Sequence, residues 1–514
     1  MTATPPPAPP PDRNDAEMAA RALRAALRHF EDRLQSQEAQ VARTQRQLQK
    51  LARREPAAAT ALPGGTAAPG RLPPGRRTLL VLARRLRRLL PRVWRGALVE
   101  RLAQPAGGPD YRNRLRALSA SGRLAGVRRV GLIAPARLKG VAQAVADLLD
   151  GMSLHGSVHS RMPASFTDDL YLVLSPGAFP HLPPAERRIL WLVEAGEPGA
   201  EAADWQRLFA SLAVFEARAP RIATLLAGGL VQHQIFHVPL PSATASSPAP
   251  ADRSPFGLPH MLARALHGCG VLDDAGFEAA TAETDLDAPA FVLCLPEAPE
   301  RFAHAGESRQ HGARLFPGLR HIDGWKGTAL SYRYLARRAL QAGRPHLVVW
   351  EDDARLPADF ADRLPALLAF LQEHAGAWDL FSGLISDLSA QAHITALRPY
   401  GEDLLIELDT VIGMVFGIYG PEALQALAAY RVEGEDVMRD TIDRHLERLG
   451  LRCWTLFPPL VGHADHLSST LWDVPGQRFL GNDRFNPMID RSQLRLLAKI
   501  ADRLAAGNDD GPPA

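Results

Sequence analysis

The pattern of apolar and polar residues divides the chain into segments of different character. Between residues 125 and 241, short apolar runs alternate with more polar segments, several of them long enough for a helix. Runs of this kind, bounded by Gly, Pro or polar residues, are typical of buried strands, and strands that alternate with helices form parallel sheets. We predict a Rossmann-like α/β domain here, with strands at residues 129–134, 170–174, 188–193, 212–215 and 235–238.

A second α/β pattern fills residues 289–475. Apolar runs at 291–295 and 346–350 predict strands, and residues 324–342 between them predict a helix. The fold class is therefore α/β, with one layered domain following another. The remaining segments are a Ser/Ala/Pro linker at 242–255, one or two connecting helices at 256–288, and a C-terminal helix (491–504) with a disordered tail within 476–514.

Near the N-terminus, apolar residues recur with the alternating four-and-three spacing of a heptad repeat. After a disordered Pro-rich start at 1–14, this stripe predicts a coiled coil over 15–54 that would make the protein a homo-oligomer. The alternative is a single amphipathic helix packed on its own domain. A Pro/Gly/Ala linker at 55–75 separates the segment from the rest of the chain and favours the coiled coil. The stripe consists of Leu23, Leu27, Phe30, Leu34, Val41, Leu48 and Leu51.

Arginines interleave with apolar residues over 76–120, which predicts a basic amphipathic helical region. Residues 76–101 include Trp94 and suit an anionic bilayer, because the apolar side can enter the interface while arginines meet lipid phosphates. The alternative is a solvated helix face in an arginine-rich protein, and Pro91 would interrupt the helix. Peripheral membrane contact through 76–101 is thus one of two expectations.

Composition narrows the choice of compartment and partner. The chain of 514 residues is long enough for several domains, its formal net charge is nearly balanced at +3, and no nucleic-acid partner is expected. The three cysteines, Cys269, Cys294 and Cys453, are far apart and have neither metal-binding nor disulfide spacing. We find no signal-peptide pattern and no apolar run of transmembrane length. These features predict a cytoplasmic protein, either free or peripheral on the inner face of the cytoplasmic membrane.

Three acids, Glu351, Asp352 and Asp353, directly follow the apolar run at 346–350. Ligands bind at the carboxyl ends of strands in open α/β sheets, so we expect these acids at a ligand-binding edge. A cation would relieve their mutual repulsion, and carboxylate oxygens favour Mg²⁺ or Mn²⁺. The alternative is a polar strand end that leads into a helix.

Several features follow one another in this half of the chain. The first is a strand that ends in Leu-Pro and is followed by Arg301, and the second is a helix that begins at a Gly and contains Ser331. Then come the strand that ends at Glu351 and a strand-Gly-Pro-helix unit at 411–430. The last is an acidic helix, followed by a strand that ends near His463. This order over residues 289–475 resembles glycosyltransferase family 25, which includes bacterial lipopolysaccharide and lipooligosaccharide sugar transferases and, more distantly, collagen galactosyltransferases. Tyr332 departs from the pattern, because the family usually has His after the helix-opening Ser.

The resemblance implies a GT-A-like α/β layer domain. It also implies a metal-dependent, inverting hexosyl transfer from a nucleotide diphosphate sugar to a hydroxyl of a cell-envelope glycan or glycolipid of the lipopolysaccharide type. Asp443 matches an acid of the family and would be the catalytic base that activates the acceptor. The remaining roles implied are metal ligation by Asp353, with Glu351 and His463, and donor binding by Arg301, Ser331, Glu351 and Asp352.

Lys326 is added to the donor-binding set from its position alone, since a cation at the same sheet edge could meet the diphosphate. Ordinary ion pairs are the alternative for Lys326 and Arg301, and a structural role is the alternative for His463. Asp440 and Asp443 are predicted to begin one helix and to share one face of it, where Asp440 would be a cap.

Residues 125–241 are loosely similar to the N-terminal Rossmann-like half of transferases built from two facing Rossmann domains, at 175–180, 191–197 and 237–241. No second such half follows, so this domain is expected to be a binding or docking module. Two alternatives for the whole protein stay open. It could be a catalytically inactive glycan-binding or assembly scaffold, or a two-headed glycosyltransferase with a second active domain at 125–241.

Overall fold

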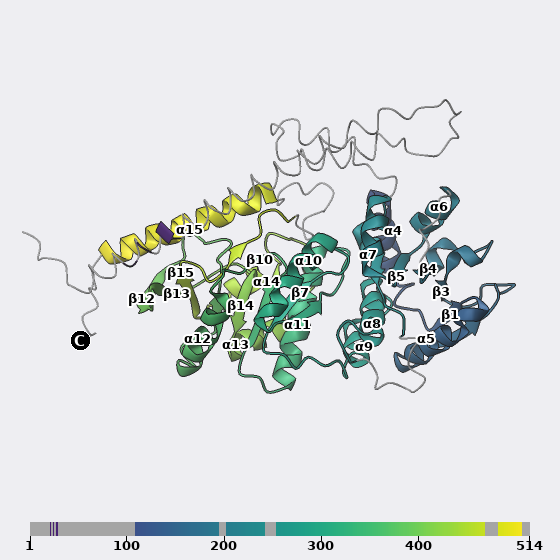
Figure 1. Cartoon of the computed structure of the whole chain (residues 1–514), viewed down its shortest axis with the longest axis horizontal. Coiled ribbons are helices and arrows are strands. Elements are labelled where there is room, and N and C mark those ends of the chain that lie inside the picture. Colours follow the sequence, from purple (N-terminus) through teal and green to yellow (C-terminus); the bar gives the residue numbers. More distant parts are fainter. Residues whose placement is uncertain are drawn as a thin grey trace, which may run out of the picture.

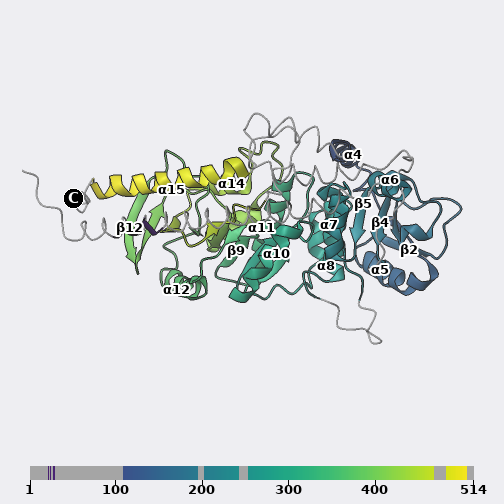
Figure 2. The same cartoon turned by 45° about the horizontal axis from the view of Figure 1, so that its top comes forward.

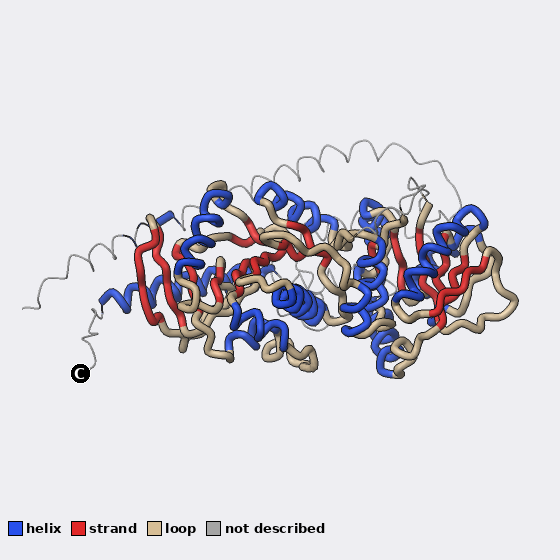
Figure 3. Tube along the Cα trace, turned by 90° about the horizontal axis from the view of Figure 1, so that it is seen from below, coloured by secondary structure: helices blue, strands red, loops and turns tan. Residues whose placement is uncertain are grey.

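The computed structural model describes residues 21, 24, 27, 28, 108–194, 202–241, 253–467 and 482–505. Its strands form a six-stranded and an eight-stranded sheet, which lie side by side along the long axis of the molecule (Figure 1). Figure 3 shows the strands in two groups with helices between them. The two sheets with their helices confirm the predicted α/β class.

All neighbouring strands of the first sheet are parallel, in the order β2-β1-β3-β4-β5-β6. Every predicted strand of this domain is present. β2 was not predicted, because its sequence His-Gly-Ser-Val-His has no apolar run; among the described strands it pairs only with β1, at the sheet edge. The strands are β1 (Arg129–Ile133), β2 (His155–His159), β3 (Leu170–Leu174), β4 (Arg188–Leu192), β5 (Ala213–Glu216) and β6 (Ile235–His237).

Helices cover both faces of the first sheet. Alternate residues of a strand point to opposite faces, so each strand contributes to two cores. In β3, Leu170 and Leu172 join the core that contains α5 (Lys139–Gly151), whereas Tyr171 and Val173 join the core that contains α7 (Ala219–Ala227). A strand buried on both faces must be apolar throughout, as β3 is. The other helical segments here are α4 (Gly108–Ala120), α6 (Ala202–Ala210) and the 3₁₀ turns η1 (Ala136–Leu138), η2 (Pro176–Ala178), η3 (Ala185–Arg187) and η4 (Gln232–Gln234).

The second sheet is mixed, in the order β12-β13-β15-β11-β14-β9-β7-β8. Its β7, β8 and β9 are parallel, so their carboxyl ends share one edge, and β14 pairs antiparallel with β9. β10 and β16 form a separate two-stranded ladder. The strands are β7 (Phe291–Cys294), β8 (Arg314–Pro317), β9 (Leu347–Glu351), β10 (Ala354–Arg355), β11 (Leu380–Ser382), β12 (Ile394–Tyr400), β13 (Asp403–Leu408), β14 (Phe416–Tyr419), β15 (Cys453–Phe457) and β16 (Gly462–His463).

The helices predicted for the second half are present. The connecting segment holds two helices, α11 occupies the predicted helix at 324–342, and the C-terminal helix begins earlier than residue 491. This last helix, α15, lies along the second domain in Figures 1 and 2, where Ser492 Oγ accepts a hydrogen bond from Leu388 N at 3.1 Å. The helical segments are α8 (Leu258–Gly268), α9 (Asp274–Ala280), α10 (Pro299–Glu307), η5 (Ser308–His311), α11 (Gly324–Gln341), α12 (Phe360–Glu373), α13 (Pro421–Ala429), α14 (Ile442–Glu447) and α15 (Asn482–Ala505).

The predictions for the N-terminal region fall almost entirely outside the described residues. This applies to the Pro-rich start at 1–14, the linker at 55–75, the basic segment 76–101 and most of the coiled coil at 15–54. Residues 21, 24, 27 and 28 are helical, and Arg28 Nη2 lies 3.1 Å from Asp403 Oδ1 at the β12–β13 turn. Of the helices that the structure describes, none combines the length and apolar character needed to cross a bilayer.

Candidate functional site

The three acids after β9 lie at the edge where β7, β8 and β9 end. Glu351 is the last residue of β9, and Asp352 and Asp353 connect β9 to β10. Asp352 and Asp353 are only 5% and 7% exposed. Asp352 and Asp353 are therefore buried at the sheet edge rather than solvated, and Glu351 beside them is half-buried.

Arg301 lies between two of these acids. Its helix α10 begins at Pro299, after the turn that follows β7, and this places the guanidinium beside the end of β9. Arg301 Nε donates to Asp352 Oδ1 at 2.7 Å, and Nη2 donates to Asp353 Oδ2 at 2.9 Å. Burial disfavours the charged guanidinium, but Asp352 and Asp353 overcome this effect and raise the pKa of Arg301.

His463 also reaches Asp353, because β16 pairs with β10 and sets His463 opposite Ala354. His463 Nε2 lies 3.3 Å from Asp353 Oδ2, and Nδ1 lies 3.3 Å from Asp465 Oδ1. Burial disfavours the imidazolium, but Asp353 and Asp465 overcome it and raise the pKa of His463 to about 9. His463 is thus positively charged at neutral pH.

The electrostatics of the acids differ from one residue to the next. Burial opposes the charge of Asp353, but Arg301 and His463 hold its pKa below the usual range, so it is ionised. Burial and the nearby Asp353 raise the pKa of Glu351 well above its usual range. Burial also raises the pKa of Asp352, although Arg301 opposes the shift. The three acids together can carry more negative charge than Arg301 and His463 neutralise.

Asp353 retains an unused ligand atom. Its Oδ1 is buried and has no hydrogen-bond partner among the described residues, a costly state for a carboxylate oxygen. A hard cation such as Mg²⁺ or Mn²⁺ accepts such oxygens, so the residues present fit the predicted metal. Over the described ranges, no three His, Cys, Asp or Glu side chains already form a metal-binding group.

Glu351 and Asp352 border a pocket at the boundary between the two domains. The second domain contributes the end of β7, the loop after β8 and the start of α11, and the first domain contributes Gln232 and His233. Asp353, His463, Lys326 and Asp443 are not among the residues that line it. The lining includes four residues predicted from the sequence, Arg301, Ser331, Glu351 and Asp352.

Ser331 holds the loop after β8 against α11. Its Oγ accepts from Leu319 N at 2.7 Å and donates to Gly327 O at 2.7 Å. Gly327 is required there, because a Cβ would lie 2.6 Å from Leu319 O. The Ser331 hydroxyl therefore shapes the pocket through the backbone.

Tyr332, which stands where the resembled family usually has His, is fully buried. Its hydroxyl donates to Met414 O at 2.9 Å, and its ring meets Tyr419 edge to face. The departure from the family pattern thus joins α11 to the segment before β14.

Lys326 lies in the first turn of α11, with Nζ 3.4 Å from Glu435 Oε1 and 5.3 Å from the centre of the Trp325 ring. Glu435 itself is 90% exposed. The structure thus pairs Lys326 with a surface acid, which is the alternative that the sequence left open.

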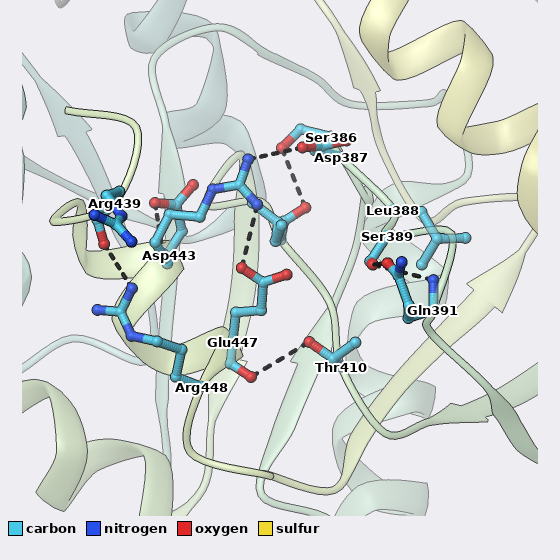
Figure 4. Close-up of polar contacts among 12 residues, drawn as sticks. Ser386, Asp387, Leu388, Ser389, Gln391, Thr410, Arg439, Asp443, Glu447 and Arg448 are labelled. Atoms are coloured by element: carbon cyan, nitrogen blue, oxygen red, sulfur yellow. Dashed lines mark hydrogen bonds and ion pairs between the residues drawn. The ribbon is translucent and has the colours of Figure 1, made fainter. Parts of the chain in front are cut away.

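Asp443 is the second residue of α14, and its Oδ1 accepts from Arg444 N at 2.9 Å (Figure 4). Arg444 fixes this helix by pairing with Asp387 at 2.8 Å. The prediction that Asp440 begins the helix is wrong, because Thr441 is the N-cap and Asp440 Oδ2 instead accepts from Asp436 N in the preceding turn. Burial and the nearby Asp353 and Asp352 raise the pKa of Glu351, and Asp443 raises it further by a smaller amount.

Sequence reasoning missed the residues that join the two domains at the pocket. Glu297, in the turn after β7, accepts from His237 N at 2.7 Å and forms ion pairs with Arg264 and Arg320. A Glu directly after Leu-Pro gives no local sign of burial, since its partners come from α8 and from the loop after β8.

No protein-family model matches this chain, and no curated protein matches it. The resemblance to glycosyltransferase family 25 therefore rests on the motifs alone.

Proposed function

We propose that the protein is a metal-dependent, inverting glycosyltransferase that moves a hexose from a nucleotide diphosphate sugar to a hydroxyl of a cell-envelope glycan or glycolipid. The observation that carries the proposal is the group formed by Arg301, Asp352, Asp353 and His463 at the shared edge of β7 and β9, beside a pocket that Glu351 also lines. Parallel strand ends of this kind hold nucleotide ligands in open α/β sheets.

A divalent ion, Mn²⁺ or Mg²⁺, would be held by Asp353 and Glu351 and would neutralise the charge on the diphosphate. His463, whose Nε2 lies 3.3 Å from Asp353 Oδ2, would be the third ligand. A metal ion binds the neutral imidazole, so binding would release the proton that His463 carries beside Asp353. Arg301, which lines the pocket, would add positive charge near the leaving diphosphate, whereas Lys326 would have to leave Glu435 to do so.

In the transfer step, the oxygen of the acceptor hydroxyl forms a bond to the anomeric carbon of the donor. The bond from that carbon to the diphosphate oxygen breaks, and its electron pair leaves with the diphosphate. Asp443 takes the proton of the hydroxyl as general base. Attack opposite the leaving group inverts the anomeric centre.

An inactive glycan-binding scaffold is the second candidate. The observation in its favour is Tyr332, whose hydroxyl is used in a buried hydrogen bond where the family usually has His. The retention of Glu351, Asp353 and Asp443 together favours the enzyme.

For either candidate we propose that copies of the chain associate through residues 15–54. We also propose peripheral membrane contact through 76–101 and a cytoplasmic location.

The test is to incubate the purified full-length protein with a panel of nucleotide sugars and Mn²⁺ or Mg²⁺, and to measure release of the nucleoside diphosphate. The proposal expects release with at least one donor and its loss when the metal is chelated. Tight donor binding without turnover, with any metal and in the presence of lipopolysaccharide-type acceptors, would favour the scaffold. Absence of both donor binding and release would contradict the enzyme, and failure to bind lipopolysaccharide-type glycans as well would contradict the scaffold.

A further inference from the structure

The pocket is closed by the first domain as well as by the second. Gln232 and His233 belong to η4, just before β6, yet they line the same pocket as Glu351 and Asp352. Arg320, from the loop after β8, donates to Gln232 O at 2.8 Å and lies 3.1 Å from Glu297 Oε2. The backbone of η4 is thus bound to the second domain by a hydrogen bond from Arg320, which its ion pair with Glu297 holds in place.

His233 offers a neutral hydrogen-bond donor. Burial and the neighbouring Arg320 and Arg112 hold the pKa of His233 well below its usual range, so the ring is uncharged. Arg112 Nη2 lies 3.4 Å from His233 Nδ1. Because a guanidinium can only donate, Nδ1 accepts and the proton of the neutral ring is on Nε2.

Gln232 offers a second donor. Its Nε2 is buried and has no hydrogen-bond partner among the described residues. A buried amide nitrogen without an acceptor is unfavourable, and a ligand that brings an oxygen to it would recover that cost.

The second domain supplies an apolar surface to the same pocket. Leu293 and Leu295 lie against Gly318, where a Cβ would be 3.1 Å and 3.4 Å from their methyl carbons. The glycine lets these side chains pack closely against the loop after β8, and both residues line the pocket. Arg301 and Arg320 also line the pocket, but acids already pair with both of them. The apolar surface beside neutral N–H donors suits a flat ring with carbonyl oxygens.

We propose that Gln232 and His233 donate hydrogen bonds to a carbonyl-bearing nucleobase of the donor, so that the first domain sets base specificity in the second domain's site. This inference rests on the proposed function. Uracil, cytosine and guanine have a ring carbonyl, whereas adenine has none. The first domain is accordingly part of one composite site rather than a second active domain.

The test is titration calorimetry of the full-length protein with UDP, CDP, GDP, ADP and inorganic pyrophosphate in the presence of Mn²⁺. At least one carbonyl-bearing nucleotide should bind roughly tenfold or more tightly than ADP, the usual range for one or two hydrogen bonds. Gln232→Leu nearly keeps the size of the side chain and removes the N–H donor without adding a charge. The substitution should weaken the binding of that nucleotide about tenfold, while the affinities for ADP and pyrophosphate change little.

His233→Phe provides a second variant that removes a donor and keeps a ring. Gln372→Leu, at an exposed position of α12, is the control and should bind like the wild type. Thermal melting of each variant checks that it is folded. If all four nucleotides bind equally and the variants change nothing, the inference is wrong while the proposed function stands. If no nucleotide or pyrophosphate binds, the proposed function fails as well.

Discussion

Glu297 accepts hydrogen bonds from both terminal nitrogens of Arg264, at 2.8 and 2.9 Å, in the boundary between the two α/β domains. Both side chains are fully buried. A bidentate pair of this kind is strongly directional. Because Glu297 also accepts from His237 N, one carboxylate determines how the first domain meets the loop after β7.

Replacing Glu297 with Gln should lower the free energy of unfolding by about 3–5 kcal/mol, because it leaves the buried guanidinium groups of Arg264 and Arg320 without a carboxylate. Urea denaturation measures the change. Glu300→Gln, at an exposed position of α10, is the control and should stay within about 0.5 kcal/mol of the wild type. Equal stability of the two variants would contradict the role given to Glu297.

The stability of the first domain should depend on pH through Glu216. Burial raises the pKa of Glu216 to about 7, even though its carboxylate accepts from Arg218 N. An unfolded Glu titrates near a pH of about 4.3, so between these values the folded state holds a proton that the unfolded state has lost. The stabilising contribution is therefore complete below about pH 4.3 and is lost as the pH rises to about 7.

Glu216→Gln should remove this dependence and still accept the hydrogen bond from Arg218 N. We expect the variant to be more stable than the wild type by roughly 1–3 kcal/mol at a pH of about 8, and the gain to shrink towards a pH of about 4.5. Urea unfolding at both pH values measures it. The same difference at both would show that Glu216 does not titrate in this range.

Asp353→Asn should abolish metal-dependent binding of the nucleoside diphosphate, because the ionised oxygens that would hold the ion are lost. Calorimetry with and without Mn²⁺ measures the effect. Asp362→Asn, at an exposed position of α12, is the matched control and should retain binding. Metal-dependent binding that survives in Asp353→Asn would remove Asp353 from the metal site.

Asp443→Asn keeps the size of the side chain but removes the proposed base. Turnover should fall by roughly 10²- to 10⁴-fold, the usual contribution of a positioned base, while donor affinity stays nearly constant. Steady-state kinetics and donor titration separate these effects. Loss of donor binding with unchanged turnover per bound donor would make Asp443 a donor contact instead.

Tyr332→Phe should lower the free energy of unfolding by about 1–2 kcal/mol, since Met414 O loses its buried hydrogen bond from the hydroxyl. Turnover of the folded variant should be unchanged, because the hydroxyl points at the backbone. Thermal melting and transfer assays below the melting temperature check both statements. Unchanged stability with lost turnover would instead give Tyr332 a part in the chemistry.

Local patterns accounted for most of the secondary structure and failed where an element depends on its neighbours. The strand at 170–174 is apolar at every position and was predicted with its observed ends, because a strand buried on both faces leaves that signature. β2 has no such signature, since it is half-buried at a sheet edge. The start of α14 was misplaced because Asp440 makes its hydrogen bond to Asp436 in the preceding turn, a contact that spacing does not reveal.

By itself, the sequence determined the α/β class, the parallel strands of the first domain and the position of Glu351, Asp352 and Asp353 at a strand end, because hydrophobic periodicity and turn residues act over a few neighbouring positions. Only the tertiary structure decided which side chains meet there. It placed Arg301 between two acids, brought His463 to Asp353 through the β10–β16 ladder and paired Lys326 with Glu435. It also set Gln232 and His233 in the second domain's pocket. These contacts join residues far apart in the chain, and they depend on how whole sheets pack rather than on any local pattern.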